Sequence, residues 1–173
     1  GIVHCQITRP DQLERIRRLS LHVYAQCIFL DYDIRIVEER AGTELASTSY
    51  SWKTLMENGV TVSNGSDCPV ELPDVMAGIQ CAVTRKTLDG TMGPYLPKES
   101  FTVQEALDSF TKTAAFASFD EKNKGQILPG MLADFVILGE NPFQAAPEAL
   151  KDIPILSTVL EGRPVFTAPG SPV

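Results

Sequence analysis

Two short polar motifs in this chain follow apolar segments and carry side chains that could do chemistry. The run 60–63 leads into Gly65-Ser66-Asp67, and Ile2-Val3 leads into His4. Glycine and serine favour a sharp exit from a strand, which would present the aspartate at the tip of that strand. Carboxylate and imidazole groups are both ligands for divalent metals. The two motifs therefore predict a metal-hydrolase site at the ends of two strands.

The same residues also allow purely structural interpretations. A Ser-Asp pair shortly before a proline is common turn chemistry, in which Asp67 would cap the turn or helix that follows. A lone histidine such as His4 is more often bonded to backbone groups than to a metal. The residues by themselves leave these interpretations open.

The segments between the two motifs alternate between apolar strands and amphipathic helices. Strands are predicted over residues 1–6, 22–28 and 60–67, the rhythm of parallel β/α units. Parallel barrels place their chemistry at the C-terminal ends of their strands, where both motifs lie. Residues 29–48 show no clean period, which predicts a long connection on the active-site face. Four helices are predicted. The first opens at Thr8-Arg9-Pro10-Asp11 with Thr8 as N-cap, and the second covers residues 50–58. The third runs from Pro73 to about Arg85, and the fourth runs from the Thr102-Val103-Gln104-Glu105 capping box to about Phe119.

After Lys124-Gly125 the pattern changes from helical to strand-like. Short antiparallel strands are predicted at 127–128, 133–138, 155–160 and 165–166, with turns at Pro129-Gly130 and Glu161-Gly162. The predicted organisation is therefore a β/α part over residues 1–124 followed by a small β layer over residues 125–173.

The composition is that of a globular protein with an acidic surface. The 173 residues are 43% hydrophobic and 21% charged, which allows a packed core, and the net charge of -7 argues against a nucleic-acid-binding surface. No uncharged stretch approaches the roughly 20 residues of a membrane span. The four cysteines are widely spaced, which favours buried free thiols in a reducing compartment and hence a cytoplasmic protein.

Four stretches of the chain carry a resemblance to a known family. They are residues 2–6, 64–70, 96–107 and 124–136. The Ser-Asp-x-Pro sequence in the second stretch and the Gly-x-x-Ala-Asp-Phe-Val sequence in the fourth are specific when they occur together. With these stretches the chain resembles the C-terminal part of the amidohydrolase superfamily, in particular the amidohydrolase-3 branch that includes N-substituted formamide deformylase-like metal-dependent hydrolases.

The resemblance implies a fold and an activity. Members of the family are TIM-type (β/α)8 barrels with a β-sandwich, and they use divalent metals, often zinc, to hydrolyse amide or other C–N bonds of small molecules. By resemblance, residues 1–6, 22–28 and 60–67 match the last three barrel strands, and residues from about 125 onward match part of the sandwich. The implied function is hydrolysis of a non-peptide C–N bond by a metal-activated water.

The resemblance also implies roles for individual residues. Asp67 matches the aspartate of the eighth strand, which contacts the metal, takes a proton from its water and passes it to the leaving nitrogen. His4 matches the histidine of the sixth strand, a metal ligand. Gln26, near the end of the seventh strand, could line the substrate pocket, and a core-edge amide explains it equally well.

Other polar residues near the motifs receive structural interpretations. His22 precedes the second predicted strand, and Cys5 would point away from the site, so both are interpreted as structural. Asp134 is interpreted as a turn or strand-end residue. Glu71, Asp74 and Arg85 could face the pocket, but helix-start charge and surface pairing explain them equally well.

Several metal ligands implied by the family have no counterpart in this chain. It contains two histidines in total, so it cannot supply a first-strand His-x-His motif and a strand-five histidine as well. We therefore expect a C-terminal fragment of a longer hydrolase, inactive by itself, that self-associates or pairs with an N-terminal half. The alternative is a non-catalytic binding or assembly domain built from amidohydrolase elements.

Overall fold

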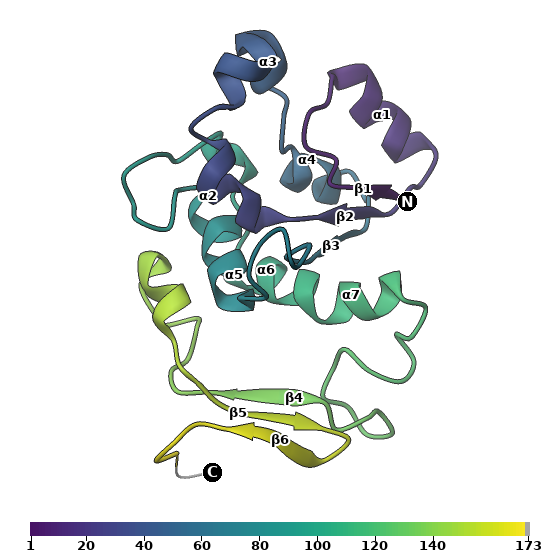
Figure 1. Ribbon diagram of the computed structural model, residues 1–173. Coiled ribbons are helices and arrows are strands. Elements are labelled where there is room, and N and C mark those ends of the chain that lie inside the picture. Colours follow the sequence, from purple (N-terminus) through teal and green to yellow (C-terminus); the bar gives the residue numbers. More distant parts are fainter. Residues whose placement is uncertain (172–173) are drawn as a thin grey trace.

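The computed structural model describes residues 1–171 and has a mixed α/β fold with two separate three-stranded sheets. The last two residues of the predicted 125–173 segment lie outside the described residues. The first sheet and its helices form the upper body in Figure 1, and the second sheet lies beyond them at the C-terminal end of the chain. No helix within the described residues is long and apolar enough to span a bilayer.

The helices and strands divide into two groups along the chain. The first group contains β1 (Ile2–Val3), α1 (Pro10–Arg18), β2 (Val23–Ala25), the 3-10 helix η1 (Cys27–Phe29), α2 (Leu30–Asp33), α3 (Val37–Ala46), α4 (Trp52–Glu57), β3 (Val62–Asn64) and α5 (Val75–Thr84). The second group contains η2 (Pro97–Glu99), α6 (Val103–Phe110), α7 (Lys112–Ala117), β4 (Phe135–Leu138), η3 (Pro147–Asp152), β5 (Ile155–Leu160) and β6 (Arg163–Thr167).

The first sheet is parallel, with the strand order β1-β2-β3, as the alternation of strands and helices predicts. Val23 in the central strand is fully buried. All three strands are shorter than predicted. The first strand ends early because His4 and Cys5 adopt positive φ angles of 66° and 50°, which a continuing strand does not allow.

Two helix starts test the predicted capping sequences. Thr102 Oγ1 accepts a hydrogen bond from the Glu105 N–H at 3.2 Å, and Glu105 Oε2 accepts one from the Thr102 N–H at 2.8 Å, so this capping box is confirmed. At α1 the prediction is wrong, because the N-cap is Arg9, whose N–H donates to Gln12 Oε1 at 2.9 Å. Thr8 instead donates its hydroxyl to a backbone carbonyl across the fold, so a tertiary contact replaces the local cap.

Residues 29–48 are largely helical, and the prediction of a connection without regular structure is wrong. Leu30, Val37 and Ala46 are buried, so α2 and α3 are held by tertiary packing. Gly42 has a φ of 79° inside α3 and interrupts its winding. This interruption removes the regular apolar period by which a helix is detected in a sequence.

The helix predicted from Thr102 to about Phe119 is in fact two helices, α6 and α7. Thr111 lies between them with φ -119° and ψ -88°, outside the helical region. Apolar residues continue on both sides of this break, so hydrophobic periodicity does not reveal it.

The second sheet is antiparallel, with the order β4-β5-β6. The Glu161-Gly162 turn joins β5 to β6 as predicted. Asp134 Oδ1 accepts a hydrogen bond from the Glu161 N–H at 2.8 Å, which confirms the turn role of this aspartate. The strand predicted at 127–128 is wrong, since these two residues have no regular secondary structure.

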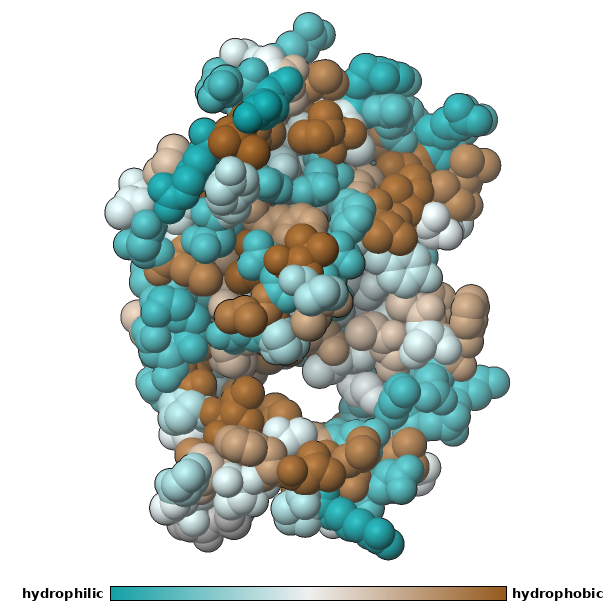
Figure 2. Space-filling view, viewed as in Figure 1, coloured by the Kyte–Doolittle hydropathy of each residue, from teal (hydrophilic) through white to brown (hydrophobic). Residues whose placement is uncertain are grey.

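The second sheet is anchored to the first part of the chain through η3. Leu150 and Ile153 are buried in the main core, and the Lys151 N–H donates to Gln80 Oε1 of α5 at 3.0 Å. Elsewhere α6, α7 and β4 line a cavity of about 510 Å³. Figure 2 shows an opening between the second sheet and the upper body. The sheet therefore packs closely at η3 and stands apart along α7.

Arg85 lies in the core, so both interpretations of it, as a pocket residue and as a surface ion pair, are wrong. It is 1% exposed, and it donates from Nε to Tyr95 O at 2.9 Å and from Nη1 to Tyr50 O at 3.2 Å. Its guanidinium lies 6.0 Å from the centre of the Trp52 ring. Burial lowers the pKa of Arg85. The side chain joins the C-terminal end of α5 to the segment that leads into α4.

Replacing Arg85 by methionine should lower the free energy of unfolding by about 2–3 kcal/mol, because two backbone carbonyls would be left buried without a donor. Urea unfolding followed by circular dichroism measures this change. Arg18→Met, on the exposed side of α1, is the matched control and should shift the free energy by less than about 0.5 kcal/mol. Equal effects of the two substitutions would contradict the role of Arg85 as a buried anchor.

Candidate metal-binding site

The C-terminal ends of β1, β2 and β3 meet at one edge of the parallel sheet, because the three strands run in the same direction. His4 follows β1, Gln26 follows β2 and Asp67 lies just beyond β3. His4 Nε2 lies 3.9 Å from Asp67 Oδ2, and His4 Nδ1 lies 2.8 Å from Gln26 Oε1. The three residues singled out from the sequence are therefore brought together.

The other histidine is placed at the opposite end of the central strand. His22 precedes β2, and its Nε2 lies 2.8 Å from Ser63 Oγ. Burial, with the nearby N-terminal ammonium group, lowers the pKa of His22. This position and these contacts agree with the structural interpretation of His22.

The backbone of His4 is fixed from two sides. Its N–H donates to Tyr24 O at 2.8 Å, and its carbonyl accepts a hydrogen bond from Trp52 Nε1 at 3.0 Å. Trp52 is fully buried. The imidazole also stacks against the ring of Phe29, with 5.8 Å between centroids and 28° between planes. These contacts hold the histidine at a left-handed φ and direct its side chain toward Asp67.

Asp67 also has a left-handed backbone, with φ 57°. Among the described residues its carboxylate accepts no hydrogen bond, so nothing supports the interpretation of Asp67 as a cap. The neighbouring Asp74 has that role, because its Oδ1 accepts from the Ala77 N–H at 3.0 Å at the start of α5. The Asp67 carboxylate is 42% exposed and remains available for a ligand.

Asn64 joins the ends of β2 and β3, a role that the sequence analysis missed. Its Oδ1 accepts from the Cys27 N–H at 2.9 Å, and the next residue, Gly65, donates its N–H to Ala25 O at 3.0 Å. The only signal in the sequence for this role is an asparagine at the end of an apolar run. The contact fixes the direction in which the chain leaves β2, and thereby the position of Gln26.

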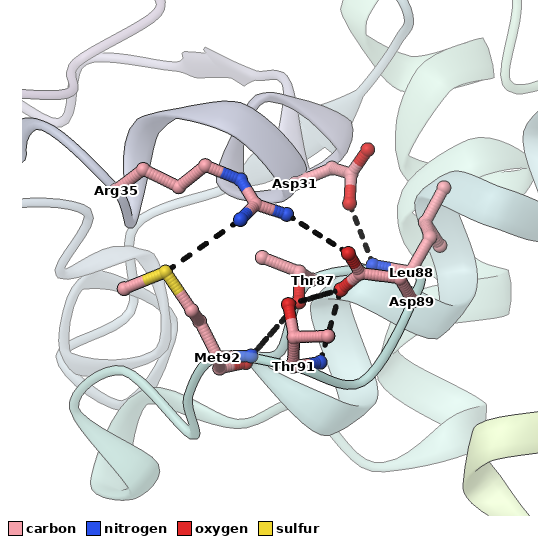
Figure 3. A network of polar contacts seen from close by, with 7 residues as sticks. All are labelled: Asp31, Arg35, Thr87, Leu88, Asp89, Thr91 and Met92. Atoms are coloured by element: carbon pink, nitrogen blue, oxygen red, sulfur yellow. Dashed lines mark hydrogen bonds and ion pairs between the residues drawn. The ribbon is translucent and has the colours of Figure 1, made fainter.

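Polar contacts also hold the segment between β2 and α3, and Figure 3 shows one group of them. Asp31 of α2 accepts a hydrogen bond from the Leu88 N–H at 2.6 Å, and Arg35 donates to Asp89 at 3.1 Å. Hydrogen bonds, foremost the one from the Thr87 hydroxyl, lower the pKa of Asp89. The loop after α5 therefore supports the segment that carries the stacked aromatic ring.

Asp33, also in α2, connects this segment to the end of β1. Its Oδ2 accepts hydrogen bonds from Gln6 Nε2 and from the Tyr50 hydroxyl, both at 2.8 Å. Burial, reinforced by the Asp33 carboxylate, raises the pKa of Tyr50, so this tyrosine is a stable donor. Since Gln6 is two residues from His4, the contact limits movement of the β1 exit.

The His4 and Asp67 side chains fit two positions of a metal's ligand shell. Two donors on a tetrahedral zinc, at bonds of about 2.1 Å, lie roughly 3.4 Å apart, so the observed 3.9 Å is close to the required separation. Catalytic zinc sites normally use three protein ligands. Residues 1–171 contain no group of three or more His, Cys, Asp or Glu side chains placed to hold a metal. The described residues thus supply a pair of candidate ligands and not a complete set.

Comparisons with known proteins place the chain in a family. The chain belongs to the amidohydrolase family, whose model matches residues 1–166. It is 34% identical over 166 residues to the amidohydrolase YtcJ of Bacillus subtilis (strain 168), covering 95% of this chain and 31% of that protein. It is 30% identical over 119 residues to the N-substituted formamide deformylase of Arthrobacter pascens, covering 69% of this chain and 22% of that enzyme. The family predicted from the four sequence stretches is confirmed.

Solved structures of metal-dependent hydrolases share the fold. An uncharacterized metal-dependent hydrolase from Pyrococcus horikoshii OT3 matches with a TM-score of 0.75 and 28% identity, over 84% of this chain and 30% of that one. A second one, from Pyrococcus furiosus, matches with a TM-score of 0.71 and 30% identity, over 83% of this chain and 28% of that one. The chain therefore spans about a third or less of the length of these relatives.

The thiols beside the candidate ligands differ in accessibility. Cys5, Cys27 and Cys81 are buried, and Cys68, directly after Asp67, is exposed, so the prediction that all four thiols are buried is wrong for this one. Burial raises the pKa of Cys5 and of Cys27 to about 11, and it also raises that of Cys81. At neutral pH the three buried thiols therefore hold almost no reactive thiolate.

We expect a single fast-reacting thiol in the native chain when it is treated with Ellman's reagent at about pH 8. The absorbance burst should correspond to Cys68, and the remaining thiols should react only in denaturant. The Cys68→Ser substitution should remove the burst, whereas the matched Cys81→Ser substitution should leave it in place. A burst that survives Cys68→Ser would show that another thiol is accessible.

Proposed function

We propose that this chain supplies part of the active site of a metal-dependent hydrolase that cleaves a C–N bond other than a peptide bond in a small amide-type substrate. The observation that carries the proposal is the 3.9 Å approach of His4 and Asp67 at the ends of neighbouring parallel strands. Membership of the amidohydrolase family supports the hydrolase class. The likeness to an N-substituted formamide deformylase supports an amide-type substrate.

In this proposal the two residues divide the chemistry between them. A divalent metal, which we propose to be zinc because of the imidazole and carboxylate donors, lowers the pKa of a coordinated water to about 7 when it is bound. His4 would hold the metal through Nε2. Asp67 would contact the metal, and its carboxylate would accept a proton from the attacking water and deliver it to the leaving nitrogen. The partial exposure of both side chains leaves room for a substrate at the same edge.

We further propose that residues 1–124 are the last part of a TIM-type (β/α)8 barrel and that residues 125–173 contribute strands to a β-sandwich. The parallel order β1-β2-β3 and the TM-score of 0.75 to a metal-dependent hydrolase support the first assignment. The separate antiparallel sheet supports the second. A whole barrel needs about 250 residues, so the other strands belong to a longer polypeptide.

The remaining metal ligands would then come from that longer polypeptide. Among residues 1–171, β1 and β3 each pair with a strand on one side only. Unpaired parallel edges expose backbone donors and acceptors that favour pairing with another strand. We propose that the N-terminal part of the polypeptide covers both edges, and that the isolated chain uses the same edges to self-associate.

In the complete polypeptide, Asp67→Asn should lower kcat by about 100-fold or more, because the substituted amide cannot accept the proton. Release of amine from a panel of N-formyl and N-acyl amines, measured with zinc present and after chelator treatment, tests this. The matched control is Asp134→Asn in the β4–β6 sheet, which should leave kcat unchanged. If Asp67→Asn retains most of the activity, Asp67 is not the proton acceptor. If the metal-loaded polypeptide hydrolyses none of these substrates, the alternative of a non-catalytic binding or assembly domain is favoured.

The isolated 173-residue chain should show no chelator-sensitive hydrolysis of the same substrates, because it supplies two candidate ligands and not three. Light scattering should detect species larger than one chain at micromolar concentration, since both sheet edges are open. Robust metal-dependent hydrolysis by the purified chain would contradict the missing-ligand argument. A stable monomer would contradict pairing through the edges.

A further inference from the structure

Gln26 is a buried residue whose side chain meets the imidazole that would bind the metal. It is 6% exposed, and its Oε1 lies 2.8 Å from His4 Nδ1. The Gln26 amide is placed with its oxygen toward Nδ1, and an amide oxygen can only accept a hydrogen bond, so this contact requires a neutral ring protonated at Nδ1. The lone pair is then on Nε2, the nitrogen that faces Asp67 at 3.9 Å.

A tight turn directly after β2 fixes the backbone of Gln26. The Gln26 carbonyl accepts a hydrogen bond from the Phe29 N–H at 3.1 Å, and Phe29 stacks on the His4 ring. Asn64 holds the same turn through the Cys27 N–H. The turn after β2 therefore controls both the proton position and the ring plane of a histidine that belongs to a different strand.

We infer that Gln26 is a positioning residue that locks His4 in the Nδ1–H tautomer, so that Nε2 is presented to a divalent cation together with Asp67. The presentation of Nε2 to a cation rests on the proposed function, whereas the tautomer of His4 can be measured without any metal. Histidines that bind metals depend on a partner at the other ring nitrogen, and loss of such a partner typically weakens metal binding 10–100-fold. The alternative roles of Gln26, as a pocket-lining residue or a core-edge amide, do not require a fixed tautomer.

The chain is well suited to a direct test, because it contains two histidines. Nitrogen-15 NMR of the histidine-labelled chain at about pH 9, where an ordinary imidazole is neutral, distinguishes the protonated nitrogen from the lone-pair nitrogen in each ring. The His22→Asn variant assigns the signals. Gln26→Met removes the acceptor and keeps a similar shape. Gln80→Met is the matched control, because Gln80 is also buried and bonded through Oε1, but to Lys151.

We expect the Nδ1–H tautomer of His4 in the parent chain and in Gln80→Met, and a mixture or the Nε2–H form in Gln26→Met. Gln26→Glu, which keeps an acceptor, should restore the parent tautomer. In the complete polypeptide, zinc affinity measured by competition with a chelating dye should fall 10–100-fold in Gln26→Met and stay unchanged in Gln80→Met. An Nε2–H tautomer in the parent chain would overturn the inference even if no variant folds, as would an unchanged tautomer in Gln26→Met. If the tautomer is as expected but the complete polypeptide binds no zinc, the proposed function fails and the positioning contact stands.

Discussion

The parallel pairing of three short strands is the constraint on which the rest of this structure depends. Tyr24 in the central strand pairs with Val3 on one side and with Ser63 on the other, so the strands end at nearly the same level. Because they share a direction, the residues that follow them emerge at one edge. A slip of one residue in this register would turn every side chain to the opposite face. The approach of His4 to Asp67 is therefore a consequence of strand register rather than of long, adaptable loops.

The strand exits carry a conformational cost that the surrounding contacts must offset. His4 and Asp67 both have positive φ angles, a region that costs a residue other than glycine roughly 1–3 kcal/mol. The buried Trp52 donates to the His4 carbonyl, and the Asn64 side chain ties the neighbouring exit to β3. Such backbone strain, held in place by buried hydrogen bonds, is typical of functional positions. The same conformation occurs at structural positions such as Arg85 and Glu161, so it marks the two strand exits without by itself assigning them a function.

The sequence predicts what is local and periodic in this chain, and fails where tertiary contacts decide. The Thr102 capping box and the parallel strand order follow from neighbouring residues and from alternation, and both are confirmed. Helices α2 and α3 escape prediction because burial and the break at Gly42 replace a regular stripe. In the site, His4 and Asp67 follow from motif and resemblance, and their approach is found in the structure. The contacts of Trp52 and Asn64 join distant segments, so no spacing in the sequence indicates them.

The contacts of α2 show why this part of the candidate site can be rigid. Asp33 connects α2 to the exit of β1 and to Tyr50, while Asp31 connects it to the loop after α5. Both carboxylates act as acceptors for groups on separate elements, so α2 is held from opposite sides. The turn that carries Phe29 lies directly before α2 and is fixed with it. The His4 side of the candidate site is thus held by contacts within this chain, through Phe29, Asp33 and Tyr50.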